Sequence, residues 1–201
     1  MLKSIKVLLL LFATTVSIAD DNPFVNTDVF ELEVAANPQI SPDGSQVAYA
    51  RRSMDVMTDR AVSSIWIVDA DGDNHRPLLS GEKSYDGPVW SPGGDRLAYV
   101  KNVEGRGPQI HVMWLSSGHS GLLTNLRHAP TNIAWSPDGR QMAFTMFVPR
   151  EASSLATPPQ KPEGAAWAPP VTVFESVQYR GDGTGYLDAG ETHIFVLSAD
   201  G

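Results

Sequence analysis

Apolar and polar residues alternate in three short segments of this chain, and a Ser-Pro dipeptide precedes each of them by a few residues. Apolar residues recur at every second position of a segment, and one of them is aromatic. This pattern is typical of a β-strand that packs between neighbouring sheets. We therefore expect strands at 46–50, 96–100 and 141–145.

The Ser-Pro dipeptides belong to a four-residue turn that occurs three times. The copies are Ser41-Pro42-Asp43-Gly44, Ser91-Pro92-Gly93-Gly94 and Ser136-Pro137-Asp138-Gly139. Proline sets φ to roughly −65° at the second position, and glycine accepts the left-handed conformation at the last. The copies start 50 and then 45 residues apart. A repeat of this length that contains a tight hairpin predicts a β-propeller with one blade per repeat.

Other apolar segments recur around each turn. First strands are expected at 87–90 and 131–135, third strands at 64–69, 109–115 and 193–197, and short fourth strands at 76–79 and 121–124. A blade thus has four antiparallel strands, and the third blade lacks its fourth strand. The expected fold is all-β, a partial propeller of about two and two-thirds blades, over 37–201.

Two regions interrupt the repeat. A lead segment, 20–36, precedes blade one; Asp28 and Glu31 resemble a helix cap, so we expect a short helix there. An insertion, 147–190, separates the second and third strands of blade three. Its many prolines favour extended backbone, and its two apolar runs, 171–174 and 177–179, are candidates for a hairpin or an irregular strand pair.

The first residues have the order of a secretory signal. Lys3 and Lys6 precede a mostly apolar stretch at 7–16, and the small residues of 17–19 suit a cleavage site. Ten helical residues rise only about 15 Å, so we expect no stable membrane span. The prediction is a signal peptide at 1–19 and export to the periplasm or the exterior; a buried N-terminal helix or an uncleaved anchor is the alternative.

The composition of the chain argues against several classes of function. The net charge of −8 argues against a nucleic-acid partner, because phosphate binding needs clustered Lys and Arg. The chain has no cysteine, which excludes disulfides, a thiolate nucleophile and a cysteine-ligated zinc. With 42% apolar residues, the chain can still bury a core.

The acidic turns are candidates for chemistry. Asp43 and Asp138 could act as catalytic carboxylates, but Gly93 takes their place in the second copy, which favours a turn role. The run 69–74 resembles the start of a calcium loop. Asn74 and Ser80 stand where such a loop needs Gly and Glu, so both a calcium site and a plain hairpin turn remain open.

Other motifs are weaker. The glycine-rich run 181–185 lacks the following helix of a phosphate loop, and 180–182 spells an adhesion tripeptide. The run 118–122 lacks the last glycine of a nucleophile elbow. The histidines show no metal spacing; they are His75, His111, His119, His128 and His193. We therefore assign no catalytic, cofactor-binding or metal-binding residue and expect no cofactor.

The repeats resemble the propellers of TolB-like proteins and of the prolyl oligopeptidase family of serine peptidases. Stretches outside the turns favour acylaminoacyl-peptidase-like and dipeptidyl-peptidase-like members of that family. The stretches are 28–32, 38–44, 51–60, 142–149, 179–183 and 192–196.

This resemblance implies seven blades that cover an α/β-hydrolase domain and restrict entry to short or unfolded peptides. No triad motif of the family maps onto this sequence, and no two glutamates are adjacent here. The expected partners are therefore a peptide substrate, through the full-length enzyme, and a C-terminal hydrolase domain missing from a truncated chain. The chain alone would not be an enzyme. The alternative is a non-catalytic periplasmic propeller of the TolB type that binds protein partners.

Overall fold

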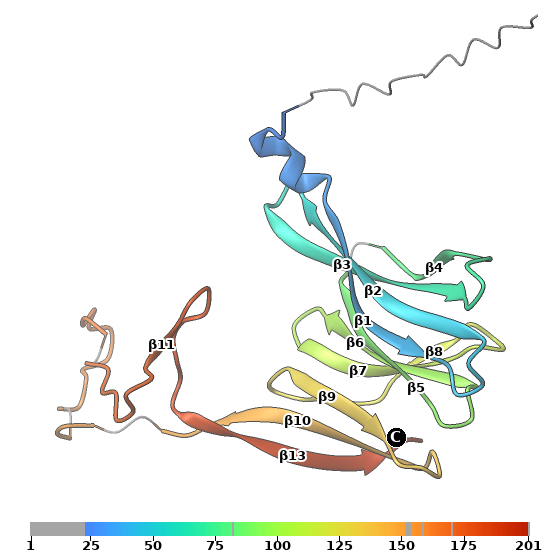
Figure 1. The fold of residues 1–201 in the computed structure, drawn as a ribbon. Helices are drawn as coiled ribbons and strands as arrows, with labels where there is room; N and C mark the ends of the chain where they lie inside the picture. The colour runs from blue at the N-terminus through green and yellow to red at the C-terminus, as the bar shows by residue number, and fades with distance from the viewer. Residues whose placement is uncertain (1–22, 82, 152–153, 158, 170, 201) are drawn as a thin grey trace, which may run out of the picture.

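The structure of the chain is a computed structural model that describes residues 23–81, 83–151, 154–157, 159–169 and 171–200. The signal peptide expected at 1–19 lies outside these residues. Antiparallel sheets follow one another along the chain and stack face to face (Figure 1). None of the helical residues described forms a helix long and apolar enough to cross a membrane.

Three of the sheets correspond to the expected blades. Blade one consists of β1 (Glu33–Ile40), β2 (Gln46–Asp55), β3 (Arg60–Asp69) and β4 (Arg76–Leu79). Blade two consists of β5 (Tyr85–Trp90), β6 (Arg96–Val103), β7 (Gly107–Trp114) and β8 (Ser120–Leu122). Blade three consists of β9 (Pro130–Trp135), β10 (Gln141–Pro149) and β13 (Gly190–Ser198), in the order β13-β10-β9. The all-β partial propeller is confirmed.

The lead segment differs in detail from its expectation. It contains a short 3-10 helix, η1 (Asn26–Phe30), which Val25 rather than Asp28 precedes as the cap residue. Asp28 lies inside the helix, and its carboxylate accepts a hydrogen bond from the Val25 backbone N–H at 2.8 Å. Asp28 therefore reaches back to the helix start, so the expected cap at Asp28 is wrong. Strand β1 already begins at Glu33, within the segment assigned as lead.

The insertion also differs from its expectation. Residues 171–174 and 177–179 form no strand; the hairpin in this region is β11 (Arg180–Gly181) paired with β12 (Gly185–Tyr186). Gly183 and Gly185 have φ values of 73° and 80°, which allow this tight turn. Strand β10 extends to Pro149 and pairs with Gly190, so the loop leaves the blade later than the sequence indicated.

The alternating pattern divides each blade into two faces. Ala48, Ile65 and Ile67 of blade one pack against the Leu97 and Tyr99 side of blade two. The opposite face of blade two packs in the same way on blade three; its cluster comprises Ala98, Ile110, Val112, Met142, Phe144 and Ala199. Blade two therefore buries its apolar side chains against a neighbouring blade on each of its faces.

The first strand of every blade contains a bulge. Asn37, Gly87 and Asn132 stand at the same place in the repeat and have φ values of 51°, 59° and 52°. Strand register shifts there in all three blades. Glycine and asparagine tolerate this left-handed conformation, and the extra residue bends the strand.

Candidate functional site

The three Ser-Pro turns share one hydrogen-bond arrangement. In blade one the Ser41 hydroxyl donates to the Asp43 carboxylate at 2.6 Å and accepts the Gln46 N–H at 2.9 Å. Blade three repeats it with Ser136, Asp138 and Gln141. In each of these two turns the serine hydroxyl accepts the backbone N–H that closes the hairpin, and the carboxylate holds this hydroxyl in place by accepting its hydrogen bond.

Blade two has the same arrangement with a carboxylate from a different position of the turn. Gly93 replaces the aspartate of the other turns, and the Ser91 hydroxyl donates to Asp95 instead, at 2.8 Å. The Ser91 oxygen still accepts the Arg96 N–H at 3.0 Å. A carboxylate is thus present in all three turns, at the third position or the fifth, and its role there is structural.

Hydrogen bonds lower the pKa values of the carboxyl groups of Asp43 and Asp138. Donation from Ser41, and then from the Ser45 backbone and hydroxyl, lowers the pKa of Asp43 to about 2. The Ser136 hydroxyl and the Arg140 N–H likewise lower the pKa of Asp138. These carboxylates stay ionised at neutral pH and suit neither a general base nor a general acid.

Consecutive turns lie against one another. A Cβ atom on Gly94 would stand 3.6 Å from the Pro42 ring, and one on Gly139 would stand 3.7 Å from the Pro92 ring. The φ values of these glycines, 72° and 69°, also favour glycine. The turns therefore form a continuous rim along one end of the stacked blades.

A tryptophan joins each blade to the one before it. The Trp90 indole N–H of blade two donates to the Gln39 carbonyl of blade one at 3.0 Å. The Trp135 N–H of blade three donates to the Val89 carbonyl of blade two at 3.1 Å. Each tryptophan directly precedes the turn serine of its own blade. Each acceptor carbonyl lies two residues before the turn serine of the preceding blade. The sequence showed these tryptophans, but only the stacking of the blades reveals their common acceptor.

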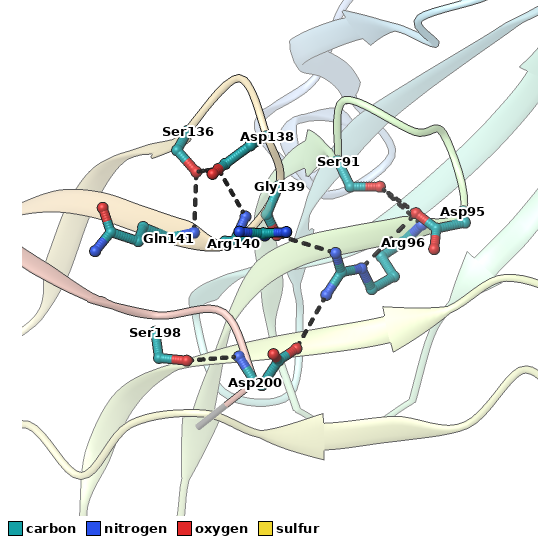
Figure 2. Close-up of polar contacts among 10 residues, drawn as sticks. All are labelled: Ser91, Asp95, Arg96, Ser136, Asp138, Gly139, Arg140, Gln141, Ser198 and Asp200. Atoms are coloured by element: carbon teal, nitrogen blue, oxygen red, sulfur yellow. Dashed lines mark hydrogen bonds and ion pairs between the residues drawn. The ribbon is translucent and has the colours of Figure 1, made fainter.

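Arg96 adds a second link between blades two and three (Figure 2). Its guanidinium donates to the Gly139 carbonyl at 3.0 Å, and one of its nitrogens lies 3.6 Å from the Asp200 carboxylate. The group also lies 4.8 Å from the centre of the Trp135 ring. Its Nε lies 3.7 Å from Asp95, beyond hydrogen-bond distance. Glutamine takes this place in the other two blades, as Gln46 and Gln141.

The insertion forms a hollow of about 720 Å³ beside the ends of β10 and β13. Aromatic and charged side chains line it, among them Phe147, Arg150, Phe174, Glu175, Tyr186 and Asp188. The rings of Phe174, Tyr179 and Tyr186 lie with centres 5.2–6.3 Å apart. A concave wall that combines the rings of Phe147, Phe174 and Tyr186 with polar and charged side chains suits an extended peptide or an apolar side chain.

The motifs singled out from the sequence lie apart from one another. Asp69 accepts hydrogen bonds from Asn74 and Gln46, which lower its pKa, so its carboxylate is occupied within the β3–β4 turn. The run 181–185 spans the β11–β12 hairpin, and Ser120 begins β8. Within the described residues, no three His, Asp or Glu side chains gather closely enough to hold a metal ion.

The histidines have no common position. His75 bonds to the Tyr49 hydroxyl at 2.7 Å, and His111 stacks on Tyr99 with ring centres 5.5 Å apart. Burial lowers the pKa of His111, and its Nε2 lacks a hydrogen-bond partner. Neither histidine adjoins a serine and a carboxylate in the geometry of a triad.

The chain is similar in sequence to peptidases and to TolB proteins. No protein-family model matches it. It is 28% identical over 171 residues to an uncharacterized peptidase, YuxL, of Bacillus subtilis (strain 168), a match that covers 85% of the chain and 25% of YuxL. It is 37% identical over 101 residues to the Tol-Pal system protein TolB of Alkalilimnicola ehrlichii, covering 50% of the chain and 22% of that protein.

A solved structure supports the fold. An acylaminoacyl peptidase of Pyrococcus horikoshii superimposes with a TM-score of 0.61 at 19% identity, over 86% of this chain and 24% of that one. The chain thus spans about a quarter of the length of these three relatives. Together, the repeated blades and the sequence similarity identify the chain as a partial β-propeller related to peptidases, as the sequence resemblance implied.

Proposed function

We propose that this chain is the N-terminal, substrate-gating propeller of an exported serine peptidase that acts on short peptides. The catalytic α/β-hydrolase domain would lie in sequence that this chain does not contain. The observation that carries the proposal is the match to YuxL, which covers most of this chain but only a quarter of the peptidase. The turn and inter-blade contacts are compatible with the proposal, because they use the motif residues for architecture.

Gating follows from the geometry of a propeller. Blades stacked around a channel leave an opening that an extended peptide can enter and a folded protein cannot. The three blades here form an open arc, so a channel requires further blades. The insertion, with its aromatic hollow, is a candidate surface for contact with the entering peptide.

The test uses the full-length product of the reading frame that contains this chain. We expect a nucleophile elbow downstream, hydrolysis of short acyl-aminoacyl or dipeptidyl reporters, and little cleavage of folded proteins. The 201-residue chain alone should hydrolyse neither reporter. A frame that ends after the propeller, without a catalytic serine, would refute the proposal.

The match to TolB favours a second candidate, a non-catalytic periplasmic propeller that binds protein partners. This candidate predicts that the reading frame ends with the propeller. It also predicts that the full-length protein retains specific partners in a pull-down but cleaves no peptide. Sequencing of the downstream reading frame therefore distinguishes the two candidates, and the peptidase assay distinguishes them independently.

Export is tested separately, because both candidates require it. An alkaline phosphatase fused after residue 30 reports export by its activity in bacterial cells. We expect activity from the natural N-terminus and a marked loss when Lys3 and Lys6 are both replaced by Glu, because the positive region is needed for targeting. A fusion that remains inactive in both forms would argue against export.

A further inference from the structure

The insertion carries three aromatic side chains that remain accessible to solvent. Phe174, Tyr179 and Tyr186 are 38%, 47% and 69% exposed, whereas Tyr99 in the core of the blades is 1% exposed. Phe174 and Tyr186 line the hollow beside β10 and β13, and Tyr179 contacts both of their rings. The hollow therefore has an aromatic wall that a ligand can reach.

Rings in the blades differ from these three, because cations of the chain itself lie over them. The Arg51 guanidinium lies 4.4 Å from the centre of the Trp66 ring, and that of Arg96 lies 4.8 Å from the centre of the Trp135 ring. Among the described residues, no lysine or arginine lies over a ring of the insertion in this way. The negative faces of these rings are therefore available to a cation from outside the chain.

A carboxylate of the hollow also lacks a partner within the described part of the chain. The charged side chains that line the hollow are Arg150, Glu175 and Asp188. Arg150 lies 3.5 Å from Glu175, so these two charges offset each other. No hydrogen bond or ion pair with another described residue engages the Asp188 carboxylate. Asp188 is therefore the uncompensated charge of the wall, two residues after Tyr186.

One side of the hollow is fixed to blade three. A Cβ atom on Gly190 would stand 2.5 Å from the Phe147 ring and 2.5 Å from the Val148 carbonyl oxygen, so the ring packs directly on the glycine. The Arg150 N–H donates to the Ala189 carbonyl at 2.9 Å, just beyond the last residue pair of β10 and β13. A ligand would therefore meet a preformed surface at the ends of two long strands.

We propose that this hollow binds the lysine or arginine side chain of an extended peptide. The aliphatic stem of that side chain lies along Phe174 and Tyr186, and its cationic end pairs with Asp188. The net charge of −8 favours the same ligands, because it attracts cationic peptides. As a substrate subsite the hollow rests on the proposed peptidase function, to which it adds a preference for basic peptides.

The shape of the hollow favours a side chain over the terminal ammonium of a peptide. An ammonium attached directly to the backbone has no aliphatic stem to cover the rings of Phe174 and Tyr186, whereas lysine and arginine have one. An anionic ligand is disfavoured, because Arg150 is already paired with Glu175. A basic side chain therefore satisfies the rings and the carboxylate together.

The test uses the full-length product of the reading frame that contains this chain. A fluorophosphonate first blocks any reactive serine, so that no probe is cleaved, and mass spectrometry reports whether a serine was labelled. The probes are alanine pentapeptides with an acetylated N-terminus, a central lysine, norleucine or glutamate, and fluorescein on an added C-terminal cysteine. Norleucine keeps the aliphatic stem of lysine without its charge. Fluorescence anisotropy measures each dissociation constant.

We expect the lysine peptide to bind at least about tenfold more tightly than the norleucine peptide, and the glutamate peptide to bind most weakly. Asp188→Asn should reduce the preference for lysine to about twofold or less. Asp182→Asn is the matched control, an exposed aspartate of the β11–β12 turn that does not line the hollow, and it should leave the preference unchanged. Tyr186→Leu should weaken lysine binding about fivefold and norleucine binding less.

Several results would overturn the inference. Equal affinities for the lysine and norleucine peptides would do so, as would the same loss of preference in Asp182→Asn as in Asp188→Asn. Tight binding that requires a free N-terminus, whatever the central residue, would show that the ligand is a terminal ammonium. A lysine preference in a protein without a reactive serine would keep the site and refute the proposed peptidase. A reactive serine without that preference would do the reverse.

Discussion

The two free faces of the arc, on blade one and on blade three, differ in how their apolar side chains are covered. On blade one, Tyr49 and Trp66 form a cross-strand pair that the blade's own polar groups cover. Arg51 lies over Trp66 and pairs with Glu33, and His75 contacts both rings. On blade three, Ile194 and Val196 lie exposed with no such cover.

This difference shows that the two ends of the arc are suited to different neighbours. Aromatic rings that carry a guanidinium and an imidazole remain compatible with water or with a polar surface. Bare β-branched side chains on the face of a sheet are typical of a surface that another sheet covers. On blade one, local side chains therefore cover the aromatic pair, although Ile40 stays 70% exposed, whereas Ile194 and Val196 on blade three have no such local cover.

The largest expected loss of stability comes from truncating an isoleucine that is buried between two blades, compared with the matching exposed isoleucine of blade three. Ile110→Ala should cost about 2–5 kcal/mol of unfolding free energy, because it removes methyl groups from a closely packed junction. Ile194→Ala, at the matching position of blade three, should change stability by less than about 0.5 kcal/mol. Urea unfolding of the two variants measures both. Similar losses would mean that the face of blade three is covered in solution.

Trp135→Phe tests the link between blades two and three. The variant keeps an aromatic ring but leaves the Val89 carbonyl without its donor, at a cost of about 1–3 kcal/mol. Trp66→Phe is the matched control on the free face of blade one, since its indole bonds only to Ser64 two residues away. We expect Trp66→Phe to lower the free energy of unfolding less than Trp135→Phe does. A larger loss for Trp66→Phe would contradict the expectation that the junction between blades two and three contributes more stability than the free face of blade one.

Arg51→Ala tests the local cover of blade one. Removing the guanidinium should cost about 0.5–1 kcal/mol and expose Trp66 to acrylamide, which is measured as increased fluorescence quenching. The added quenching should disappear when Trp66→Phe is combined with Arg51→Ala. Arg52→Ala, which removes an ion pair with Asp86 instead, should leave the quenching unchanged.

The smallest effect concerns the turn of blade one at low pH. Since folding lowers the pKa of Asp43 from 3.8 to about 2, the ionised carboxylate stabilises the native state above pH 3.8. That stability is lost as the pH falls through about 2. Asp43→Asn should therefore lower the urea midpoint at pH 5 and have progressively less effect towards pH 2. Ser41→Ala should weaken this dependence, and an Asp43→Asn effect that grows in acid would contradict the assignment.

Much of the blade architecture was predictable because it depends on local rules. Proline and glycine at fixed turn positions, followed by alternating apolar residues, specify a hairpin wherever they occur. The short fourth strands expected at 76–79 and 121–124 follow a second glycine-containing turn, and the structure has them as β4 and β8. The insertion was not, because its apolar runs have no partner strand nearby, and the hairpin formed at the glycines instead.

The contacts between blades were less predictable. Gly93 indicated a turn role for Asp43 and Asp138, but only the structure shows that Asp95 takes this role in blade two. Only the three-dimensional positions of the serine hydroxyl and of the two candidate acceptor positions, 93 and 95, reveal this exchange. Similarly, Arg96 reads as one charged residue in a strand, and its contacts with Gly139 and Asp200 lie more than forty residues away.

The sequence by itself determined the repeat, the strands of each blade and the placement of the turns, since these depend on interactions between near neighbours. It also indicated the relation to peptidase and TolB propellers. Only the tertiary structure decided which face of each strand meets the next blade, which carbonyl each tryptophan bonds to, and which apolar positions stay exposed. Identical local patterns place Ile65, Ile110 and Ile194 on equivalent faces. Whether each is buried depends on the presence of a neighbouring sheet, and no residue within the strand carries that information.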